Sequence, residues 1–215
     1  MNLRPFSRLA QFCALLPLLA ALPLPARERT LVFFGDSLTA GYGLADPDTQ
    51  AYPALISRKI AAARLPWRVV NAGLSGDTSA GGRSRIDWVL RQPIDLLVLE
   101  LGGNDGLRGL DPALTRQNLR AIIERVREKS PNTSIMLIGI RMPPNLGDEY
   151  LHSFAAIFPA VAEAERVPLI PFLLEGVGGL PEYNQADGIH PNAAGHVRVA
   201  ETVWASLRPL LTASP

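Results

Sequence analysis

The feature that most constrains the fold is a run of apolar residues, 31–34, that leads straight into Gly35, Asp36 and Ser37. A short apolar run with no polar alternation is typical of a strand that is buried on both faces of a parallel sheet. In open α/β sheets, ligands bind at the edge formed by the carboxyl ends of the strands. The sequence therefore predicts a central strand that delivers the Ser37 hydroxyl to a ligand-binding edge.

Further apolar segments alternate with segments of helical periodicity. Strands are expected at 67–71, 94–101, 134–140 and 167–172, and helices at 51–64, at 78–91, from 112, from 148 and at 193–210. Strand 94–101 is apolar nearly throughout and should be central, whereas prolines in 167–172 suit a sheet edge. Strands that alternate with helices form parallel sheets with right-handed crossovers. The predicted class is α/β, with a doubly wound sheet of five parallel strands.

The apolar spacing also predicts which helix residues face the core. In the helix that begins at Pro112, after the cap residue Asp111, the buried stripe is expected to include Leu114. In the last helix it is expected to include Val197 and Val203.

The N-terminus is expected to be a secretory signal. Arg4 and Arg8 precede an apolar run over residues 9–24, which ends just before Ala26. Cleavage after Ala26 removes residues 1–26, leaves a single domain over 27–215 and places the protein in the periplasm or outside the cell. The alternative is an uncleaved membrane anchor, although the run is shorter than the ~20 residues that a span needs.

Charge and cysteine content exclude several function classes. The 21 basic residues nearly balance the 20 acidic ones, and there is no basic run of the kind that binds nucleic acid. The only cysteine, Cys13, lies in the expected signal, so the processed chain has no cysteine nucleophile and no cysteine-ligated zinc site. The sequence contains neither metal-ligand spacing nor a glycine-rich phosphate loop, so no metal or other cofactor is expected.

Three residues at the expected carboxyl edge suggest nucleophilic catalysis. A serine hydroxyl becomes a good nucleophile when an imidazole takes its proton, and a carboxylate on the other ring nitrogen fixes the tautomer of that imidazole. Asp187 and His190 stand three residues apart, and Gly188 between them permits a tight turn. We therefore predict that Ser37 is the nucleophile, His190 the base and Asp187 the orienting acid.

Acyl transfer also needs hydrogen-bond donors for the oxyanion of the tetrahedral intermediate. The candidates are the backbone N–H of Ser37, the backbone N–H of Gly76 and the side-chain amide of Asn104. Gly76 and Asn104 each follow a predicted strand. Read alone, either residue is equally consistent with an ordinary bend or turn.

Other titratable residues receive structural interpretations. Asp36 is expected to brace the loop beside Ser37, and Asp77 and Asp105 to anchor loops or cap helices. His152 and His196 fall within predicted helices, where a catalytic role is not favoured.

Four sequence blocks resemble those of the SGNH, or GDSL, hydrolases: Gly35-Asp36-Ser37-Leu38, Gly76 in Ser-Gly-Asp-Thr-Ser, Asn104 in Gly-Gly-Asn-Asp, and His190 in Asp-Gly-Ile-His-Pro. The resemblance spans about residues 31–210, and within the family residues 100–109 and 140–143 are similar to bacterial periplasmic thioesterases and lysophospholipases. It implies a three-layer α/β/α sandwich of the flavodoxin-like type, with strand order 2-1-3-4-5, and the triad and oxyanion roles given above. It also implies acyl thioesters, lysophospholipids and aryl or short fatty-acid esters as substrates.

A bound acyl chain needs an apolar surface near Ser37. Candidates for this groove, which are equally consistent with core or loop packing, are Leu107, Leu110, Pro143, Leu146, Tyr150 and Leu180. The glycine-containing loop over 173–185 departs from the family pattern and leaves the preferred chain length open.

The leading hypothesis is a monomeric, exported serine esterase that acts on a small acyl ester or thioester. One alternative is a carbohydrate acetylesterase of the same fold, which would need an open, polar cleft. Another is a non-catalytic binding module, which would be expected to lack a member of the triad.

Overall fold

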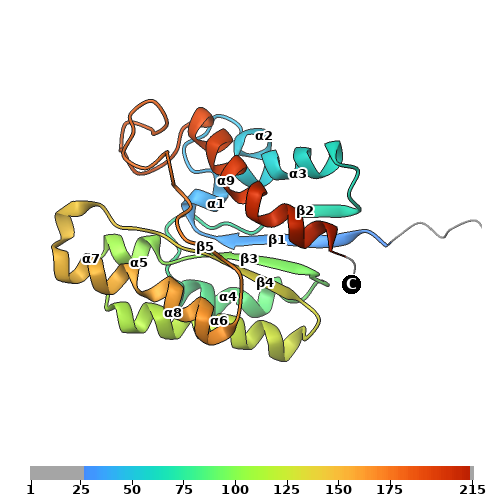
Figure 1. Cartoon of the computed structure of the whole chain (residues 1–215), viewed down its shortest axis with the longest axis horizontal. Helices are drawn as coiled ribbons and strands as arrows, with labels where there is room; N and C mark the ends of the chain where they lie inside the picture. The colour runs from blue at the N-terminus through green and yellow to red at the C-terminus, as the bar shows by residue number, and fades with distance from the viewer. Residues whose placement is uncertain (1–26, 214–215) are drawn as a thin grey trace, which may run out of the picture.

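The centre of the molecule is a sheet of five parallel strands, and helices lie on both of its faces (Figure 1). This computed structural model describes residues 27–213, so the signal expected over 1–26 lies outside the described residues. The elements in chain order are β1 (Arg29–Gly35), α1 (Ser37–Ala40), α2 (Pro47–Gln50), α3 (Tyr52–Ala62), β2 (Trp67–Asn71), α4 (Ser79–Val89), β3 (Leu96–Glu100), α5 (Gly103–Leu107), α6 (Pro112–Lys129), β4 (Ser134–Ile138), the 3-10 turn η1 (Pro144–Leu146), α7 (Asp148–Ala155), α8 (Ile157–Glu165), β5 (Leu169–Ile170) and α9 (Ala193–Thr212).

The strand order is β2-β1-β3-β4-β5, which confirms the predicted class and order. β1 is central because it pairs with two strands: Val32 lies opposite Val70 of β2 and opposite Leu97 of β3. The chain runs from β1 to β2 on one side and then crosses to β3 on the other. This reversal of direction is the switch point at which open α/β sheets bind ligands, and Ser37 follows the strand that ends there.

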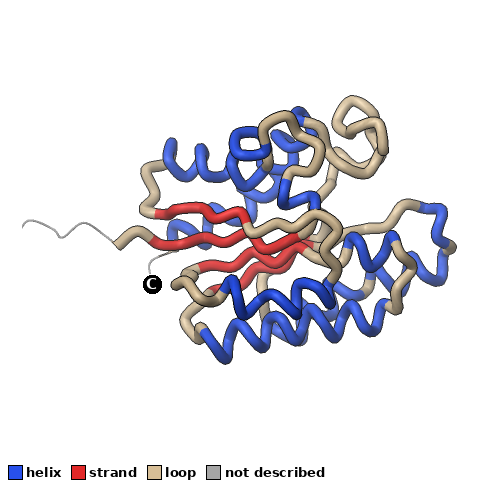
Figure 2. The backbone as a smooth tube through the Cα atoms, turned by 180° about the vertical axis from the view of Figure 1, so that it is seen from behind, coloured by secondary structure: helices blue, strands red, loops and turns tan. Residues whose placement is uncertain are grey.

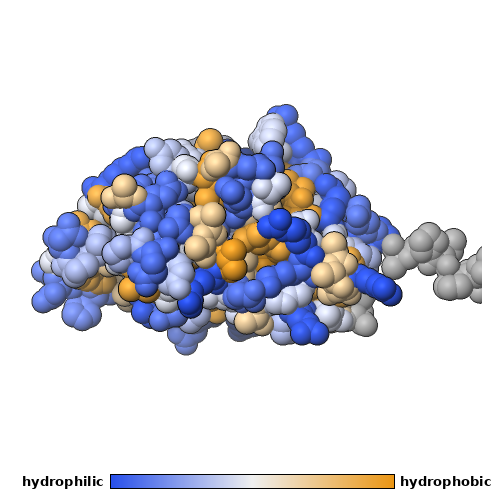
Figure 3. Space-filling model, turned by 90° about the horizontal axis from the view of Figure 1, so that it is seen from above, coloured by the Kyte–Doolittle hydropathy of each residue, from blue (hydrophilic) through white to orange (hydrophobic). Residues whose placement is uncertain are grey.

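The helices form two outer layers. Figure 1 shows α3 and α9 over one face of the sheet and α4, α6 and α8 over the other, and Figure 2 shows the same three layers from behind. Seen from the side of α3 and α9, most of the surface is hydrophilic and apolar residues gather in small groups (Figure 3). Among the helices of residues 27–213, none combines the length and apolar character that crossing a membrane requires.

The core explains why β1 is a rigid platform. Leu31, Val32, Phe33 and Phe34 are all 0 % exposed, because helices cover both faces of their strand. Burying each such side chain contributes about 1.5–3 kcal/mol relative to leaving it in water. The backbone that carries the Gly35 turn is therefore held by side chains on both sides of the sheet.

β5 is shorter than predicted. It spans two residues, Leu169–Ile170, instead of 167–172. Pro168 and Pro171 border it and have no N–H to donate to a ladder, although the Pro168 carbonyl still accepts a hydrogen bond of 2.9 Å from Leu137 of β4. The strand is at the sheet edge, as expected.

Two predictions about buried helix positions were wrong. Leu114 and Val197 are 55 % and 50 % exposed. Their neighbours Thr115 and His196 are buried instead, since each has a polar partner inside: the Thr115 hydroxyl donates to Asp105, and His196 accepts from a backbone N–H. In both helices, the side chain that faces the core is a polar residue with a buried hydrogen-bond partner, and the adjacent apolar residue faces solvent.

Candidate active site

Ser37 is the first residue of α1 and directly follows the turn that ends β1. Asp36 caps this short helix, because its carboxylate accepts a hydrogen bond of 3.0 Å from the backbone N–H of Leu38. Gly35 is required by close packing, since a Cβ there would lie 2.2 Å from the Thr39 hydroxyl oxygen. The tight turn places the Ser37 hydroxyl at the carboxyl edge of the sheet.

The structure brings His190 and Asp187 to Ser37. Ser37 Oγ lies 2.9 Å from Nε2 of His190, and Nδ1 of the same ring lies 2.7 Å from an Asp187 carboxylate oxygen. The second carboxylate oxygen accepts backbone N–H groups of Ile189 and His190 at 3.0 Å each, in a turn where Gly188 has φ +75°. With Nδ1–H donating to Asp187, the lone pair of Nε2 faces the serine hydroxyl.

The surroundings of Asp187 favour its ionised form. Burial raises the pKa of this carboxyl, but the hydrogen bonds from the His190 ring and from the backbone outweigh burial and hold the pKa below its ordinary 3.8. Asp187 is therefore negative at neutral pH and suited to stabilise an imidazolium. The Tyr42 ring packs beside the His190 ring, with a centroid distance of 4.7 Å.

The candidate oxyanion donors come from the ends of three neighbouring strands, β2, β1 and β3. Gly76, after β2, has φ +81°, and Asn104 lies in the first turn of α5. The Asn104 amide nitrogen donates to the backbone oxygen of Asp77 at 2.9 Å and makes a weaker contact of 3.4 Å with Asp36. The bond to Asp77 fixes the plane of the amide, and the contact with Asp36 is close to the longest distance of a hydrogen bond.

Glu100, at the end of β3, is a fully buried acid beneath the turn that carries Ser37. The sequence pattern did not reveal it. One Glu100 oxygen accepts the Thr39 hydroxyl at 2.7 Å and the Asp36 backbone N–H at 3.3 Å. Its other oxygen has no hydrogen-bond partner among residues 27–213. Burial, and next the charge of Asp36, raise the pKa of Glu100 well above its ordinary 4.5, which favours the protonated carboxyl. The feature of the sequence that could have indicated this buried acid is the presence of one acidic residue in an otherwise apolar strand.

Asp36 has the bracing role expected of it. Besides capping α1, it lies next to Glu100 and to the Asn104 amide. Burial raises the pKa of Asp36 to about 6, although the hydrogen bond from Leu38 lowers it in part. Asp36 thus joins the nucleophile turn to the Asn104 donor without reaching the triad.

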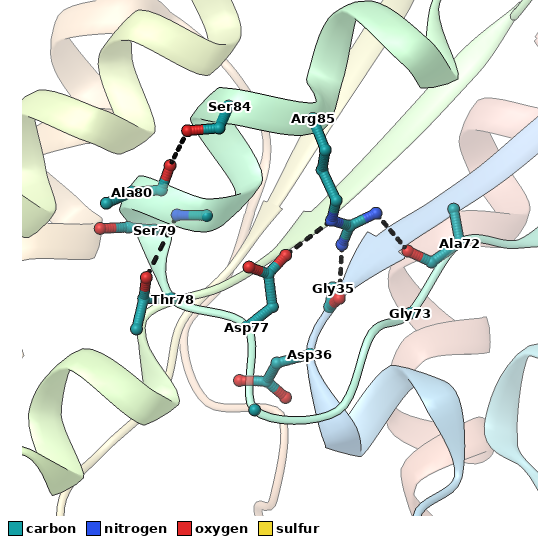
Figure 4. Close-up of polar contacts among 12 residues, drawn as sticks. Gly35, Asp36, Ala72, Gly73, Asp77, Thr78, Ser79, Ala80, Ser84 and Arg85 are labelled. Carbon is teal, nitrogen blue, oxygen red and sulfur yellow. Dashed lines mark hydrogen bonds and ion pairs between the residues drawn. The ribbon is translucent and has the colours of Figure 1, made fainter.

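Asp77 and Asp105 anchor loops, as predicted. Asp77 forms an ion pair of 2.6 Å with Arg85 of α4 (Figure 4). Asp105 accepts the backbone N–H and the hydroxyl of Ser79 at the start of α4. Thr78 caps that helix through a bond of 3.1 Å from the Gly81 N–H.

The remaining histidines lie away from the reacting groups. His152 is exposed on α7, whereas His196 is buried on α9 and its Nδ1 accepts the backbone N–H of Tyr52 at 3.2 Å. Burial, and next the charge of His190, lower the pKa of His196 to about 4. Within the part of the chain that the structure describes, no three His, Cys, Asp or Glu side chains are arranged to hold a metal ion.

A cavity of about 420 Å³ opens beside Ser37 and His190. Most of its wall comes from α5 and from the loops that follow β4 and β5. Its apolar lining includes Leu107, Ile140, Met142, Pro143, Phe172 and Leu174. The cavity size and lining fit a small ligand with an apolar part.

Two of the six predicted groove residues, Leu107 and Pro143, line this cavity. Within residues 27–213, the other four are not part of its wall: Leu110, Leu146, Tyr150 and Leu180. The Tyr150 hydroxyl instead donates to the Leu110 carbonyl at 2.8 Å, which ties α7 to the loop after α5.

Comparisons with known proteins agree with this arrangement. The sequence profile of the GDSL-like lipase/acylhydrolase family matches residues 33–198. The chain is 45 % identical over 187 residues to Esterase TesA of Pseudomonas aeruginosa, covering 86 % of this chain and 91 % of that protein. It is 43 % identical over 191 residues to Thioesterase 1/protease 1/lysophospholipase L1 of Escherichia coli, covering 86 % of each.

Solved structures show the same similarity. A crystal structure of TesA superposes with a TM-score of 0.80 at 45 % identity and covers 85 % of this chain and 99 % of its own. The psychrotrophic esterase EstA from Pseudoalteromonas sp., inhibited by monoethylphosphonate, superposes with a TM-score of 0.80 at 30 % identity and covers 86 % and 100 %. Since the family profile matches most of the chain and the relatives match along nearly all of their own length, the chain belongs to the GDSL-like lipase/acylhydrolase family of ester-hydrolysing enzymes.

Proposed function

We propose that this enzyme hydrolyses acyl esters and thioesters through an acyl-enzyme on Ser37, with His190 as the base and Asp187 as the orienting acid. One observation carries the proposal: two hydrogen bonds, of 2.9 and 2.7 Å, join the serine hydroxyl, the imidazole and the carboxylate in one line. The line ends at the mouth of the apolar cavity, where an acyl carbonyl can reach the Ser37 oxygen.

In the acylation step, Ser37 Oγ attacks the carbonyl carbon while its proton moves to Nε2 of His190. The imidazolium that results is stabilised by the ionised Asp187. Negative charge develops on the former carbonyl oxygen, and we assign the N–H groups of Ser37, Gly76 and Asn104 as its hydrogen-bond donors. When the intermediate collapses, the bond to the alcohol or thiol breaks and the leaving group takes the proton from Nε2.

Deacylation repeats these steps with water. His190 takes a proton from a water molecule, whose oxygen attacks the acyl carbon on Ser37. The second tetrahedral intermediate uses the same oxyanion donors, and its collapse releases the carboxylic acid and returns the proton to Ser37 Oγ. The enzyme leaves the cycle unchanged, and the net reaction consumes one water molecule.

The cavity supports an acyl chain as the part of the substrate that is recognised. Each CH₂ that leaves water for an apolar wall contributes up to ~0.8 kcal/mol. The carbohydrate acetylesterase alternative requires an open, polar cleft, which this apolar lining does not favour. Relatives named esterase, thioesterase and lysophospholipase are consistent with ester and thioester substrates here.

We further propose that residues 1–26 direct export and that 27–215 act as one monomeric domain. The support is the order of basic, apolar and small residues before Arg27. N-terminal sequencing of the protein recovered from the periplasm tests the cleavage site. A chain that begins at Arg27 is expected, and a full-length chain in the membrane fraction would contradict it.

The decisive experiment replaces the nucleophile. S37A should keep the far-ultraviolet circular dichroism of the wild type, because it removes one oxygen atom at the surface of the cavity. It should lower kcat on p-nitrophenyl esters to background, a loss on the order of 10⁶-fold. A fluorophosphonate probe should label the wild type and not S37A. The matched control is S84A, on the exposed side of α4, which should behave as the wild type.

Wild-type turnover or labelling in S37A would contradict the proposal. The substrate class is tested separately by comparing kcat/KM for acetyl to long-chain esters, their thioesters and an acetylated sugar. A rise of kcat/KM with chain length is expected. Preference for the acetylated sugar would instead support the carbohydrate acetylesterase.

A further inference from the structure

The guanidinium of Arg85 donates hydrogen bonds from its three nitrogens to three different acceptors (Figure 4). The contacts are Nε to the Asp77 carboxylate at 2.6 Å, Nη1 to the Ala72 carbonyl at 2.9 Å and Nη2 to the Gly35 carbonyl at 2.9 Å. The guanidinium also lies over the buried Phe34 ring, 4.0 Å from its centroid. One side chain of α4 thus reaches β1 and the loop that follows β2.

The three acceptors belong to the backbone that carries the reacting groups. Gly35 immediately precedes the Asp36–Ser37 turn. Ala72 and Asp77 bracket the loop that contains Gly76, and the middle of this loop is also joined to β1, because the Leu74 N–H donates to the Gly35 carbonyl at 3.0 Å. Arg85 therefore holds the Gly76 loop at both ends and fixes it against the strand that carries the nucleophile.

Asp77 extends this support to the third donor. Its carboxylate pairs with Arg85, while its backbone oxygen accepts the Asn104 amide at 2.9 Å. The side chains of Arg85 and Asp77 are only 21 % and 6 % exposed, so water screens their attraction weakly. The peptide that orients the Asn104 amide is thus held by the same guanidinium.

We propose that Arg85 is a positioning residue for the oxyanion site, which holds the Gly76 N–H and the Asn104 amide at a fixed distance from Ser37. The inference rests on the proposed function of Ser37 and goes beyond it. Arginine suits this role, because its planar fork of donors can satisfy three separate acceptors at once. Lysine carries the same charge on a single nitrogen and cannot bridge all three.

The test is R85K, which preserves the charge and removes the fork. Displacement of catalytic groups by about 1 Å costs about 10²-fold in rate, so kcat on a p-nitrophenyl ester should fall by about that factor. KM should stay within about twofold, since the acyl cavity does not contain Arg85. The pH at which kcat/KM reaches half of its maximum should not move, because the charge and the triad are retained.

The matched control is R83K on the same helix. Arg83 is exposed. Within residues 27–213, its side chain forms one hydrogen bond, to Asn118 at 3.3 Å. It should retain the wild-type kcat. Both variants are assayed well below their melting temperatures, with active sites counted by fluorophosphonate labelling, so that a loss of folded enzyme is not read as a loss of turnover.

A double-mutant cycle with N104A separates positioning from general loosening of the fold. If Arg85 acts through the donors, R85K should cost clearly less in the N104A background than in the wild type. Losses that multiply in full would overturn the role of Arg85 in positioning Asn104, and wild-type kcat in R85K would overturn the whole proposal. If R85K does not fold, D77N gives the same test in milder form: kcat should fall while KM holds.

Failure of this inference is distinguishable from failure of the proposed function. Activity in S37A would remove the acyl-enzyme mechanism itself. Wild-type turnover in R85K, with S37A and N104A both impaired, would remove only the role of Arg85.

Discussion

Replacing the buried Glu100 by glutamine should change how the stability of the protein depends on pH, while keeping the shape of the side chain. Burial and the charge of Asp36 raise the pKa of Glu100 well above the ordinary 4.5 that it has in the unfolded chain. Between these two pKa values the folded state holds a proton that the unfolded state has lost. The free energy of unfolding therefore falls as the pH rises through this window, and the contribution of Glu100 is complete only below pH 4.5.

The magnitude follows from one proton. A difference of one bound proton changes the free energy of unfolding by about 1.4 kcal/mol per pH unit. Between pH 5 and pH 7, the wild type should lose stability relative to E100Q, which has no titratable group at this position, and the loss reaches about 2.5 kcal/mol when the folded state keeps the proton throughout this range. His196 is present in both proteins, so its own titration largely cancels from the difference, whereas the titration of Asp36, which lies next to Glu100, contributes to it.

The assay is urea denaturation followed by circular dichroism at pH 5, 6 and 7. The control is E124Q, because the Glu124 side chain is 55 % exposed on α6 and forms only a surface ion pair. Its stability curve should run parallel to that of the wild type. If the curve of E100Q also runs parallel, Glu100 is ionised in the folded protein and the reasoning about its burial is wrong.

Two further predictions concern the triad and the buried histidine. D187N should keep the turn at Gly188 but lower kcat on p-nitrophenyl esters by about 10⁴-fold, because an amide favours the wrong tautomer of His190; a loss of less than tenfold would argue against an orienting role. H196N tests the pKa of about 4 that burial gives His196. This pKa lies below the ordinary 6.5, so the unfolded chain binds more protons than the folded one in this window, and the wild type should lose about 3 kcal/mol of stability as the pH falls from 7 to 4. H196N should flatten that part of the urea-denaturation profile, and an unchanged slope would contradict it.

The fold could be predicted in outline because burial leaves a direct trace in the sequence. Strands β1 and β3 are covered on both faces, so their apolar runs are nearly unbroken. Apolar runs do not state which strands are neighbours, and the order of the strands came from the family resemblance. Periodicity also failed where a polar side chain had a partner inside, as Thr115 and His196 do, because the pattern records polarity and not the contacts that compensate for it.

The residues of the candidate site also fall into those that the sequence predicts and those that only the folded structure reveals. Ser37, Gly76, Asn104 and His190 follow strands or turn signals, so topology alone placed them at one edge. Arg85 lies in the middle of a helix where arginine is usually a solvated residue, and only the meeting of α4 with two strand ends gives it acceptors. The cavity wall likewise depends on how the loops after β4 and β5 fold over the edge, which local sequence does not determine.

The buried acids around the proposed oxyanion site share one feature, which is that the negative charge of each is reduced or compensated. A negative oxygen that forms near Gly76 and Asn104 is repelled by any uncompensated carboxylate close to it. Three acids lie there, and the negative charge of each is reduced in a different way. The Arg85 guanidinium pairs with Asp77, and the raised pKa of Glu100 favours its neutral form. Asp36 accepts hydrogen bonds from N–H groups of α1 and Asn104. Polar groups thus supply the rigid hydrogen-bond network that positions the donors, while pairing and protonation keep their negative charge from opposing the transition state. Arg85 serves both needs at once, because the same guanidinium that orients the Gly76 loop also neutralises the acid next to it.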